Sequence, residues 1–221
     1  MEKEIYKEIN LMKKKIIVLV MSILAITGIT FMTGLFSGVS NLALKRFIYI
    51  LINLLNGGVA FVAIKLTGIK IDLDFKNKKQ FLIGICVALI LSLVIAFIPA
   101  LFGTSLIGQH TEFSWSSILF NLFFYMIIIG PVEELIFRVY LQETFTEFFT
   151  KNKWIGVIIT ALIFGLWHFI NGSFIQVLFT FGIGLVFGFS KYLIKDCKYL
   201  GIAVGHGLYD FLNVIVRMFI I

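Results

Sequence analysis

Charged residues are scarce in this sequence. Asp, Glu, Lys and Arg together make up 14% of the 221 residues, whereas hydrophobic residues make up 60%. A soluble domain carries about 25% charged and about 45–50% apolar residues. The composition therefore excludes an ordinary soluble domain and predicts a protein that lies largely within a lipid bilayer.

Cysteine and proline are also rare, with two residues of each. Cys86 lies in an apolar run and Cys197 in a basic loop, so they predict neither a disulfide nor a zinc ligand set. The sequence has no Pro-, Gly- or Ser-rich linker and no internal repeat, which favours a single integral domain. The N-terminal segment is long and charged, and no small-residue cleavage site follows it. We therefore expect the first apolar run to be a retained span.

Basic residues are in excess, and the net charge is +7 at pH 7. A basic chain can bind nucleic acid, but here the lysines form short clusters between apolar runs. Loop charges of this kind orient membrane proteins, so we expect a lipid bilayer as a partner and no nucleic acid. The clusters are Lys13–Lys15; Lys76, Lys78 and Lys79; Lys151 and Lys153; and Lys191, Lys195 and Lys198.

The apolar runs predict an all-α fold, a polytopic transmembrane helical bundle with about seven spans. A helical span needs about 20 mostly apolar residues, and open strand edges are not tolerated in lipid. The fourth run begins near Ser116 and continues past Arg138. The other runs are Ile16–Phe36, Phe47–Leu66, Phe81–Phe102, Trp154–Ile170, Phe174–Ile194 and Tyr199–Ile220.

The lysine clusters also predict an orientation. They alternate with segments that lack basic residues, and Gly103–Ser117 contains no Lys or Arg. This alternation fits seven spans with the N-terminus inside and the C-terminus outside. Lys45 and Arg46 are exceptions, since they fall on the outer side.

A small set of ionisable residues lies within the apolar runs, where one charge at the bilayer centre costs about 2.5–3.5 kcal/mol on insertion scales. Glu134 and Arg138 are four residues apart, so they share a helix face and can pair. His206 and Asp210 have the same spacing, and Asn213 continues their face. The set is Glu133, Glu134, Arg138, His168, His206 and Asp210.

Glu133 points away from the Glu134 pair, and the chain can bring it close to His168. The fourth and fifth runs form a helical hairpin that turns near Lys151, eighteen residues after Glu133 and seventeen before His168. Antiparallel helices then place the two residues at a similar depth. Gly130-Pro131 predicts a kink or a helix start just before Glu133. The depth of His206 is not fixed by this argument.

These residue types favour hydrolysis of an amide bond. A carboxylate beside an imidazole can remove a proton from water, and a second imidazole with a polar neighbour can stabilise an oxyanion. No Ser or Cys nucleophile stands out. The same groups can instead hold a divalent metal such as zinc, with Glu133, His168 and His206 as candidate ligands. The buried ionisable residues have two other interpretations. They can form hydrogen bonds between helices, or they can be the relay of a proton- or ion-coupled transporter.

Three motifs occur in order: EELIFR (Glu133–Arg138), FGLWH (Phe164–His168) and HGLYD (His206–Asp210). In this order they resemble the CAAX-protease and bacteriocin-processing family of intramembrane proteases, also called the Abi family. The resemblance covers residues 116–217 and leaves residues 1–115 as additional N-terminal transmembrane helices. It implies an intramembrane endopeptidase, of the glutamate or metallo type, in a bacterial cytoplasmic membrane. Its substrate would be a peptide or a membrane protein.

The resemblance also implies a role for each polar residue. Glu133 and His168 would activate water, and His206 and Asp210 would form an oxyanion hole. Eukaryotic CAAX members have Asn where this chain has Asp210. An ionised Asp cannot donate a hydrogen bond, so Asp210 is either protonated or has another role. The alternative is a non-catalytic peptide-binding member, such as an immunity or scaffold protein. The implied orienting residues are Glu134 and Arg138.

Overall fold

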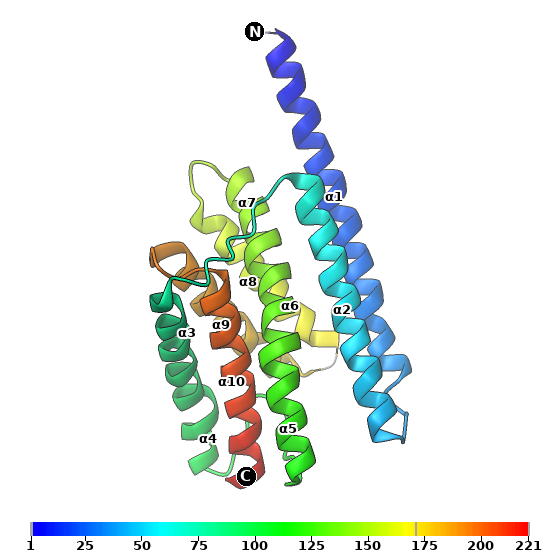
Figure 1. Cartoon of the computed structure of the whole chain (residues 1–221), viewed down its shortest axis with the longest axis vertical. Coiled ribbons are helices and arrows are strands. Elements are labelled where there is room, and N and C mark those ends of the chain that lie inside the picture. The colour runs from blue at the N-terminus through cyan, green and yellow to red at the C-terminus, as the bar shows by residue number, and fades with distance from the viewer. Residues whose placement is uncertain (1, 171, 221) are drawn as a thin grey trace.

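The computed structural model describes residues 2–170 and 172–220 as a bundle of helices (Figure 1). No strand occurs within these residues, and the predicted all-α class is confirmed. The α-helices are α1 (Glu2–Leu35), α2 (Leu42–Thr67), α3 (Lys78–Leu91), α4 (Ile98–Leu101), α5 (Trp115–Phe123), α6 (Gly130–Glu134), α7 (Gln142–Phe148), α8 (Trp154–Trp167), α9 (Phe174–Leu193) and α10 (Tyr199–Phe219). Wider π-helical segments are η1 (Ser92–Phe97), η2 (Phe124–Ile129) and η3 (Leu135–Leu141), and η4 (His168–Ile170) is a 3₁₀ turn.

Six helical stretches in the described part of the chain are long and apolar enough to cross a membrane. Of the seven predicted spans, the one over Trp154–Ile170 is shorter than expected, because α8 has only 14 residues. At 1.5 Å per residue it is about 21 Å long, less than the hydrocarbon core of about 30 Å. The helix ends where the backbone tightens into η4. His168 therefore sits at the end of a helix rather than inside one.

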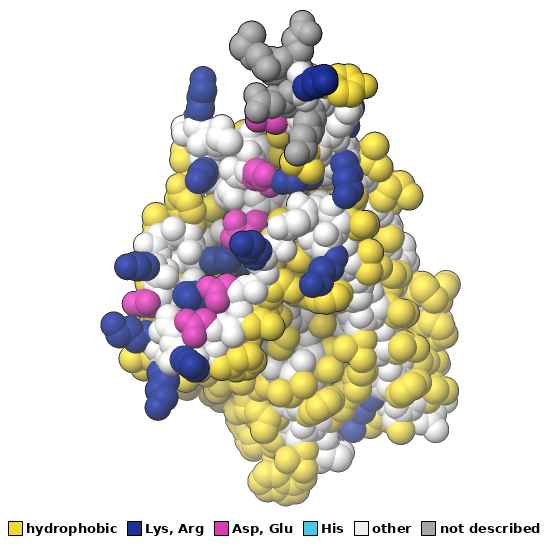
Figure 2. Space-filling model, turned by 45° about the horizontal axis from the view of Figure 1, so that its top comes forward, with side chains coloured by type: hydrophobic (Ala, Val, Ile, Leu, Met, Phe, Trp, Pro, Cys, Tyr) yellow, Lys and Arg dark blue, Asp and Glu magenta, His cyan; other side chains and the backbone are white. Residues whose placement is uncertain are grey.

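The two ends of the bundle differ in charge. The N-terminus of α1 lies at the same end as the loops that follow α2, α7 and α9, whereas α10 ends at the opposite end (Figure 1). Lysines and carboxylates gather at the first of these ends, and apolar side chains cover the flanks below it (Figure 2). We call it the lysine-rich end.

Ion pairs connect the loop between α2 and α3 with the residue that precedes α10. Lys198 Nζ lies 2.9 Å from an oxygen of Asp72 and 3.2 Å from one of Asp74. The hydrogen bond from Lys198 holds the pKa of Asp74 below its usual value. The two carboxylates raise the pKa of Lys198 in return, with Asp72 the larger cause.

The central helical stretch runs from Trp115 to Phe148 without a break. Of the two alternatives predicted at Gly130-Pro131, a kink or a helix start, a separate helix start does not occur, because Ile129 and Gly130 keep helical dihedral angles. The π-helical segment η2 comes directly before Gly130, and η1 precedes the other proline, Pro99, in the same way. A proline ring clashes with the carbonyl four residues earlier, and a wider π-helical turn displaces that carbonyl. The helix therefore passes both prolines.

Glycines let α10 approach the central stretch closely. A Cβ atom added to Gly207 would lie 2.9 Å from Met126 Cα, which is backbone and cannot move aside. A Cβ atom on Gly130 would lie 2.8 Å from the Gly207 backbone nitrogen. Small residues permit this kind of helix contact in membrane proteins. Because the two helices are so close at Gly207, the neighbouring residue His206 lies next to Glu133 and Glu134 of the central stretch.

Candidate active site

Glu134 and Arg138 form the predicted ion pair on one face of the central stretch. Arg138 Nε lies 3.3 Å from Glu134 Oε2, and both side chains are completely buried. The guanidinium also lies 5.2 Å from the centre of the Phe164 ring, on α8. A buried charge is tolerated when it is paired. The contact between Arg138 and Phe164 joins the central stretch to α8.

His206 lies at the centre of a buried polar cluster that also contains Glu133, Glu134 and Asp210. Its Nδ1–H donates a 2.7 Å hydrogen bond to Glu134 Oε1. The ring of Phe187 stacks on the imidazole with centroids 5.1 Å apart, and the Phe164 ring meets it edge-on at 5.7 Å. Only 2% of His206 is exposed. The ring is therefore fixed in orientation, with Nε2 directed away from Glu134.

Two further carboxylates lie near the Nε2 atom of His206. Asp210 Oδ2 is 3.5 Å away, one helical turn along α10 as predicted, and Glu133 Oε2 is 3.7 Å away. Glu133 lies outside the Glu134–Arg138 pair, also as predicted. Its Oε2 atom is buried and accepts no hydrogen bond from the residues that the structure describes.

His168 is oriented by the helix that it ends. Its Nδ1–H donates a 2.8 Å hydrogen bond to the carbonyl oxygen of Phe164. The two rings also meet edge-on at 4.7 Å, since both residues occupy one face of α8 as predicted. In a neutral imidazole that donates through Nδ1, the other nitrogen is an acceptor. His168 thus presents Nε2 as a free acceptor.

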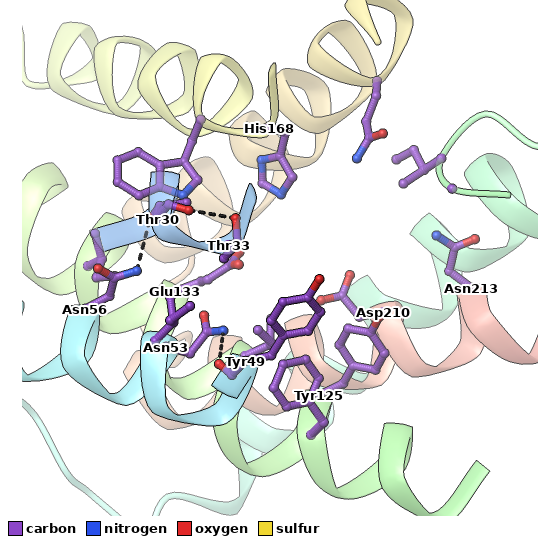
Figure 3. A pocket seen from close by; sticks show the side chains of 18 of the residues that line it. Thr30, Thr33, Tyr49, Asn53, Asn56, Tyr125, Glu133, His168, Asp210 and Asn213 are labelled. Atoms are coloured by element: carbon purple, nitrogen blue, oxygen red, sulfur yellow. Dashed lines mark hydrogen bonds between the residues drawn. The ribbon is translucent and has the colours of Figure 1, made fainter. Parts of the chain in front are cut away.

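Glu133, His168 and Asp210 line one cavity of about 480 Å³ between the helices. Figure 3 shows the three side chains around the same space, although they come from three different segments. The hairpin register that predicted a similar depth for Glu133 and His168 agrees with this placement. His206 is not part of the cavity wall and lies behind Glu133 and Asp210.

Tyrosines and amides complete the cavity wall, and the sequence motifs did not point to most of them. Tyr49 and Tyr125 lie next to Asp210, and Asn53 lies on the same helix as Tyr49 (Figure 3). Asn213 was expected on the His206 face and does line the cavity. Asn53 and Asn56 interrupt the apolar run of α2 and line the cavity, and polar residues in a span were the available signal.

The sequence motifs also did not predict the hydrogen bond between His206 and Glu134. Spacing within one helix predicts Glu134 with Arg138 and His206 with Asp210, but it says nothing about which helices touch. Gly207, which meets the backbone of Tyr125 and Met126, is the signal that could have found it. Such glycines mark a close helix contact.

A metal does not fit the polar residues as they are arranged. The candidate ligands were Glu133, His168 and His206. Across residues 2–170 and 172–220, no three His, Cys, Asp or Glu side chains form a group that could hold a metal ion. Each of the two histidines has only Nε2 to offer as a ligand, because Nδ1 is engaged with Phe164 or Glu134. We therefore derive no step through a metal.

A side chain of α10 lines the far end of the cavity. Arg217 Nη1 donates a 2.8 Å hydrogen bond to the carbonyl oxygen of Gln109, in the loop between α4 and α5. Ile107 and Gly108 of that loop line the cavity together with Arg217. The cavity therefore extends from Glu133 toward the end of the bundle opposite the lysine-rich end.

Comparison with known proteins gives one family. A family model described as type II CAAX prenyl endopeptidase Rce1-like matches residues 114–212. No curated protein sequence and no solved structure matches the chain. The matched range contains all three sequence motifs and every polar residue from Glu133 to Asp210 described above. Residues 114–212 of the chain are therefore similar to the Rce1-like type II CAAX prenyl endopeptidases.

Proposed function

We propose that this chain is an intramembrane endopeptidase that hydrolyses a peptide bond of a membrane-associated protein or peptide. Glu133 and His168 activate the attacking water. The observation that supports the proposal is that a carboxylate and an imidazole from two helices line one buried cavity. The Phe164 carbonyl occupies Nδ1 of His168, which leaves Nε2 to hold the water.

The reaction needs one water molecule and no covalent intermediate. Glu133 accepts a proton from the water as the water oxygen attacks the carbonyl carbon of the substrate. Nε2 of His168 accepts a hydrogen bond from the other hydrogen of the water. The electron pair of the C=O bond moves onto the oxygen. When the C–N bond breaks, Glu133 passes its proton to the leaving nitrogen, and the products are a carboxylic acid and an amine.

Asp210 is the residue best placed to stabilise the oxyanion. It lines the cavity next to Glu133, and as a carboxylic acid it can donate a hydrogen bond to the developing charge. Such a donor typically contributes about 10²–10³-fold to kcat. The sequence motifs implied that His206 shares this role. Because His206 lies behind the cavity wall, we assign it the positioning of Glu133 and Asp210 instead.

Glu134 and Arg138 keep His206 in that position. Glu134 accepts the Nδ1 hydrogen of His206 with one oxygen, and its other oxygen faces Arg138. Buried partners of this kind fix the orientation of an imidazole and the tautomer it adopts. Neither Glu134 nor Arg138 lines the cavity, so neither contacts the substrate.

The cavity also suggests how the substrate arrives. Its volume of about 480 Å³ lies in the usual range for binding sites, and it accommodates the few residues around a scissile bond. Ser37, Ile107 and Arg217 line its far part, which favours an entrance toward the end of the bundle opposite the lysine-rich end. With the N-terminus inside a bacterial cytoplasmic membrane, as the positive-inside rule predicts, this is the outer half of the bilayer.

The proposal is tested by cleavage in membranes. Cells express the native chain, Glu133→Ala or Glu112→Gln, and new protein N-termini in the membrane fraction are identified by mass spectrometry. Glu112 is an exposed carboxylate in the loop between α4 and α5, so it serves as a matched control. We expect the same new N-termini with the native chain and Glu112→Gln, and none with Glu133→Ala. Identical N-termini in all three would reject the proposal.

A non-catalytic peptide-binding member of the family gives a different result in the same experiment. Such a protein captures the same peptide with or without Glu133 and cleaves it in neither case. The intact set of Glu133, His168 and Asp210 around one cavity favours the catalytic function.

A further inference from the structure

A second cavity, of about 400 Å³, lies at the lysine-rich end. It forms where α7 and α10 begin and α9 ends, and it shares no lining residue with the candidate active site. Figure 2 shows this end of the molecule, with basic and acidic side chains close together. The basic residues that line the cavity are Lys70, Lys153, Lys191, Lys195 and Lys198.

The cavity carries an excess of positive charge. Asp72 and Glu143 are the carboxylates among its lining residues. Asp72 pairs with Lys198, and Glu143 pairs with Lys191. The remaining three lysines form no ion pair with a carboxylate in the described part of the chain. They therefore have their charges available for an anion.

Gln142 contributes a buried acceptor to the same cavity. Only 3% of this residue is exposed, and its Nε2 atom donates a 3.1 Å hydrogen bond to the carbonyl oxygen of Gly188. Its Oε1 atom is buried and accepts no hydrogen bond from residues 2–170 or 172–220. Leaving such an atom unpaired is unfavourable. A hydroxyl group in the cavity would satisfy it.

Apolar side chains flank the cavity on the lipid side. Tyr192 lines the cavity and is 41% exposed, and Leu193 follows it with 70% exposed. Both lie in the last turn of α9, an apolar helix long enough to cross a membrane. A ligand with a phosphate at the lysines and an acyl chain along α9 would match this arrangement. A free phosphate would use only the lysines.

We infer that this cavity binds the headgroup of an anionic phospholipid that carries free hydroxyl groups, of the phosphatidylglycerol type. The unpaired lysines hold the phosphate, a headgroup hydroxyl donates to Gln142 Oε1, and an acyl chain lies on Leu193. Basic pockets between transmembrane helices are known to hold anionic lipid headgroups. This site is independent of the peptidase activity.

Lipid titration of the purified full-length chain, followed by native mass spectrometry, tests the inference. Phosphatidylglycerol is compared with phosphatidylmethanol, which has the same charge without headgroup hydroxyls, and with zwitterionic phosphatidylcholine. Glycerol 3-phosphate is added as the soluble source of the same chemistry. We expect phosphatidylglycerol to bind best, phosphatidylmethanol more weakly and phosphatidylcholine least, with no competition from glycerol 3-phosphate at the lipid concentration. Equal binding of the three lipids, or competition at that concentration, would overturn the assignment.

Paired variants separate the cavity from general surface charge. Lys70→Gln with Lys195→Gln removes two charges from the cavity. Lys76→Gln with Lys78→Gln removes two charges from the same end of the bundle but outside the cavity. We expect phosphatidylglycerol to bind at least ~10-fold more weakly to the first variant, and as in the native chain to the second. Equal weakening in both would show that the lysines act only as surface charge.

Discussion

His206 Nδ1 lies 2.7 Å from Glu134 Oε1, although 72 residues separate them in the sequence. Glu134 also faces Arg138 on its own helix, 3.3 Å away. Three buried polar side chains therefore form a continuous chain behind the cavity wall. The far side of the His206 ring faces Glu133 and Asp210, so the buried chain supports the residues that line the cavity.

Breaking this buried chain at Glu134 should destabilise the protein. Glu134→Gln leaves Arg138 as a buried charge without a partner, and such a loss costs about 3–5 kcal/mol in the free energy of unfolding. Denaturant unfolding in detergent measures it. The double variant Glu134→Gln with Arg138→Met removes both charges of the pair, so it should lose less than the sum of the two single variants. Additive losses would contradict the pairing.

Asp210 should act as a hydrogen-bond donor. Asp210→Asn keeps a donor of similar shape, so we expect most of the activity to remain, whereas Asp210→Ala should lose about 10²–10³-fold in kcat. The native activity should decline as rising pH removes the proton of Asp210, and the Asn variant should lack this decline. The pH–rate profiles of the two variants decide the question. Equal and severe losses in both would reject the donor role.

The close contact of α10 with the central stretch should depend on Gly207. In Gly207→Ala the new Cβ atom meets the backbone of Met126, so the helices must separate. We expect a loss of about 1–3 kcal/mol in the free energy of unfolding. We also expect a drop in kcat, because His206 moves away from Glu134.

Gly182→Ala is the matched control for this packing prediction. Gly182 lies in α9, and a Cβ atom added there meets no other atom within 4 Å. Alanine is the better helix former by about 0.5–1 kcal/mol, so this variant should be as stable as the native chain or more stable. A similar loss of stability in both variants would mean that the helix contact is not the cause.

Much of the fold follows from apolar length and helical spacing. The length of the apolar runs predicted the helices, and the i, i+4 rule predicted Glu134 with Arg138 and His206 with Asp210. The hairpin count around Lys151 placed Glu133 and His168 at one depth. Each of these predictions uses distances along one helix or across one short turn.

The remaining features depend on how distant helices pack. His206 contacts Glu134, and Tyr49 lines the same cavity as Asp210. In both cases the residues come from segments far apart in the sequence. Pro131 predicted a kink or a helix start, but the wider turn of η2 lets the helix continue. The early end of α8 at His168 was also not evident, because the apolar run continues past it to Ile170.

Catalysis should not depend on a metal ion. The oxygens of Glu134 face Arg138 and His206, and no three donor side chains form a metal group within the described residues. We expect activity to survive chelation, measured together with metal analysis of the purified chain. Stoichiometric zinc, with activity lost on its removal and restored on refilling, would reverse this expectation.

The most direct measurement of the central claim is the cleavage rate of purified Glu133→Gln in proteoliposomes, with the peptide that the membrane experiment identifies. Gln keeps the size of Glu133 and removes the base. We predict that kcat falls by at least ~10²-fold, while KM and the thermal unfolding temperature stay close to native values. A Glu133→Gln variant that cleaves at the native rate would contradict the account.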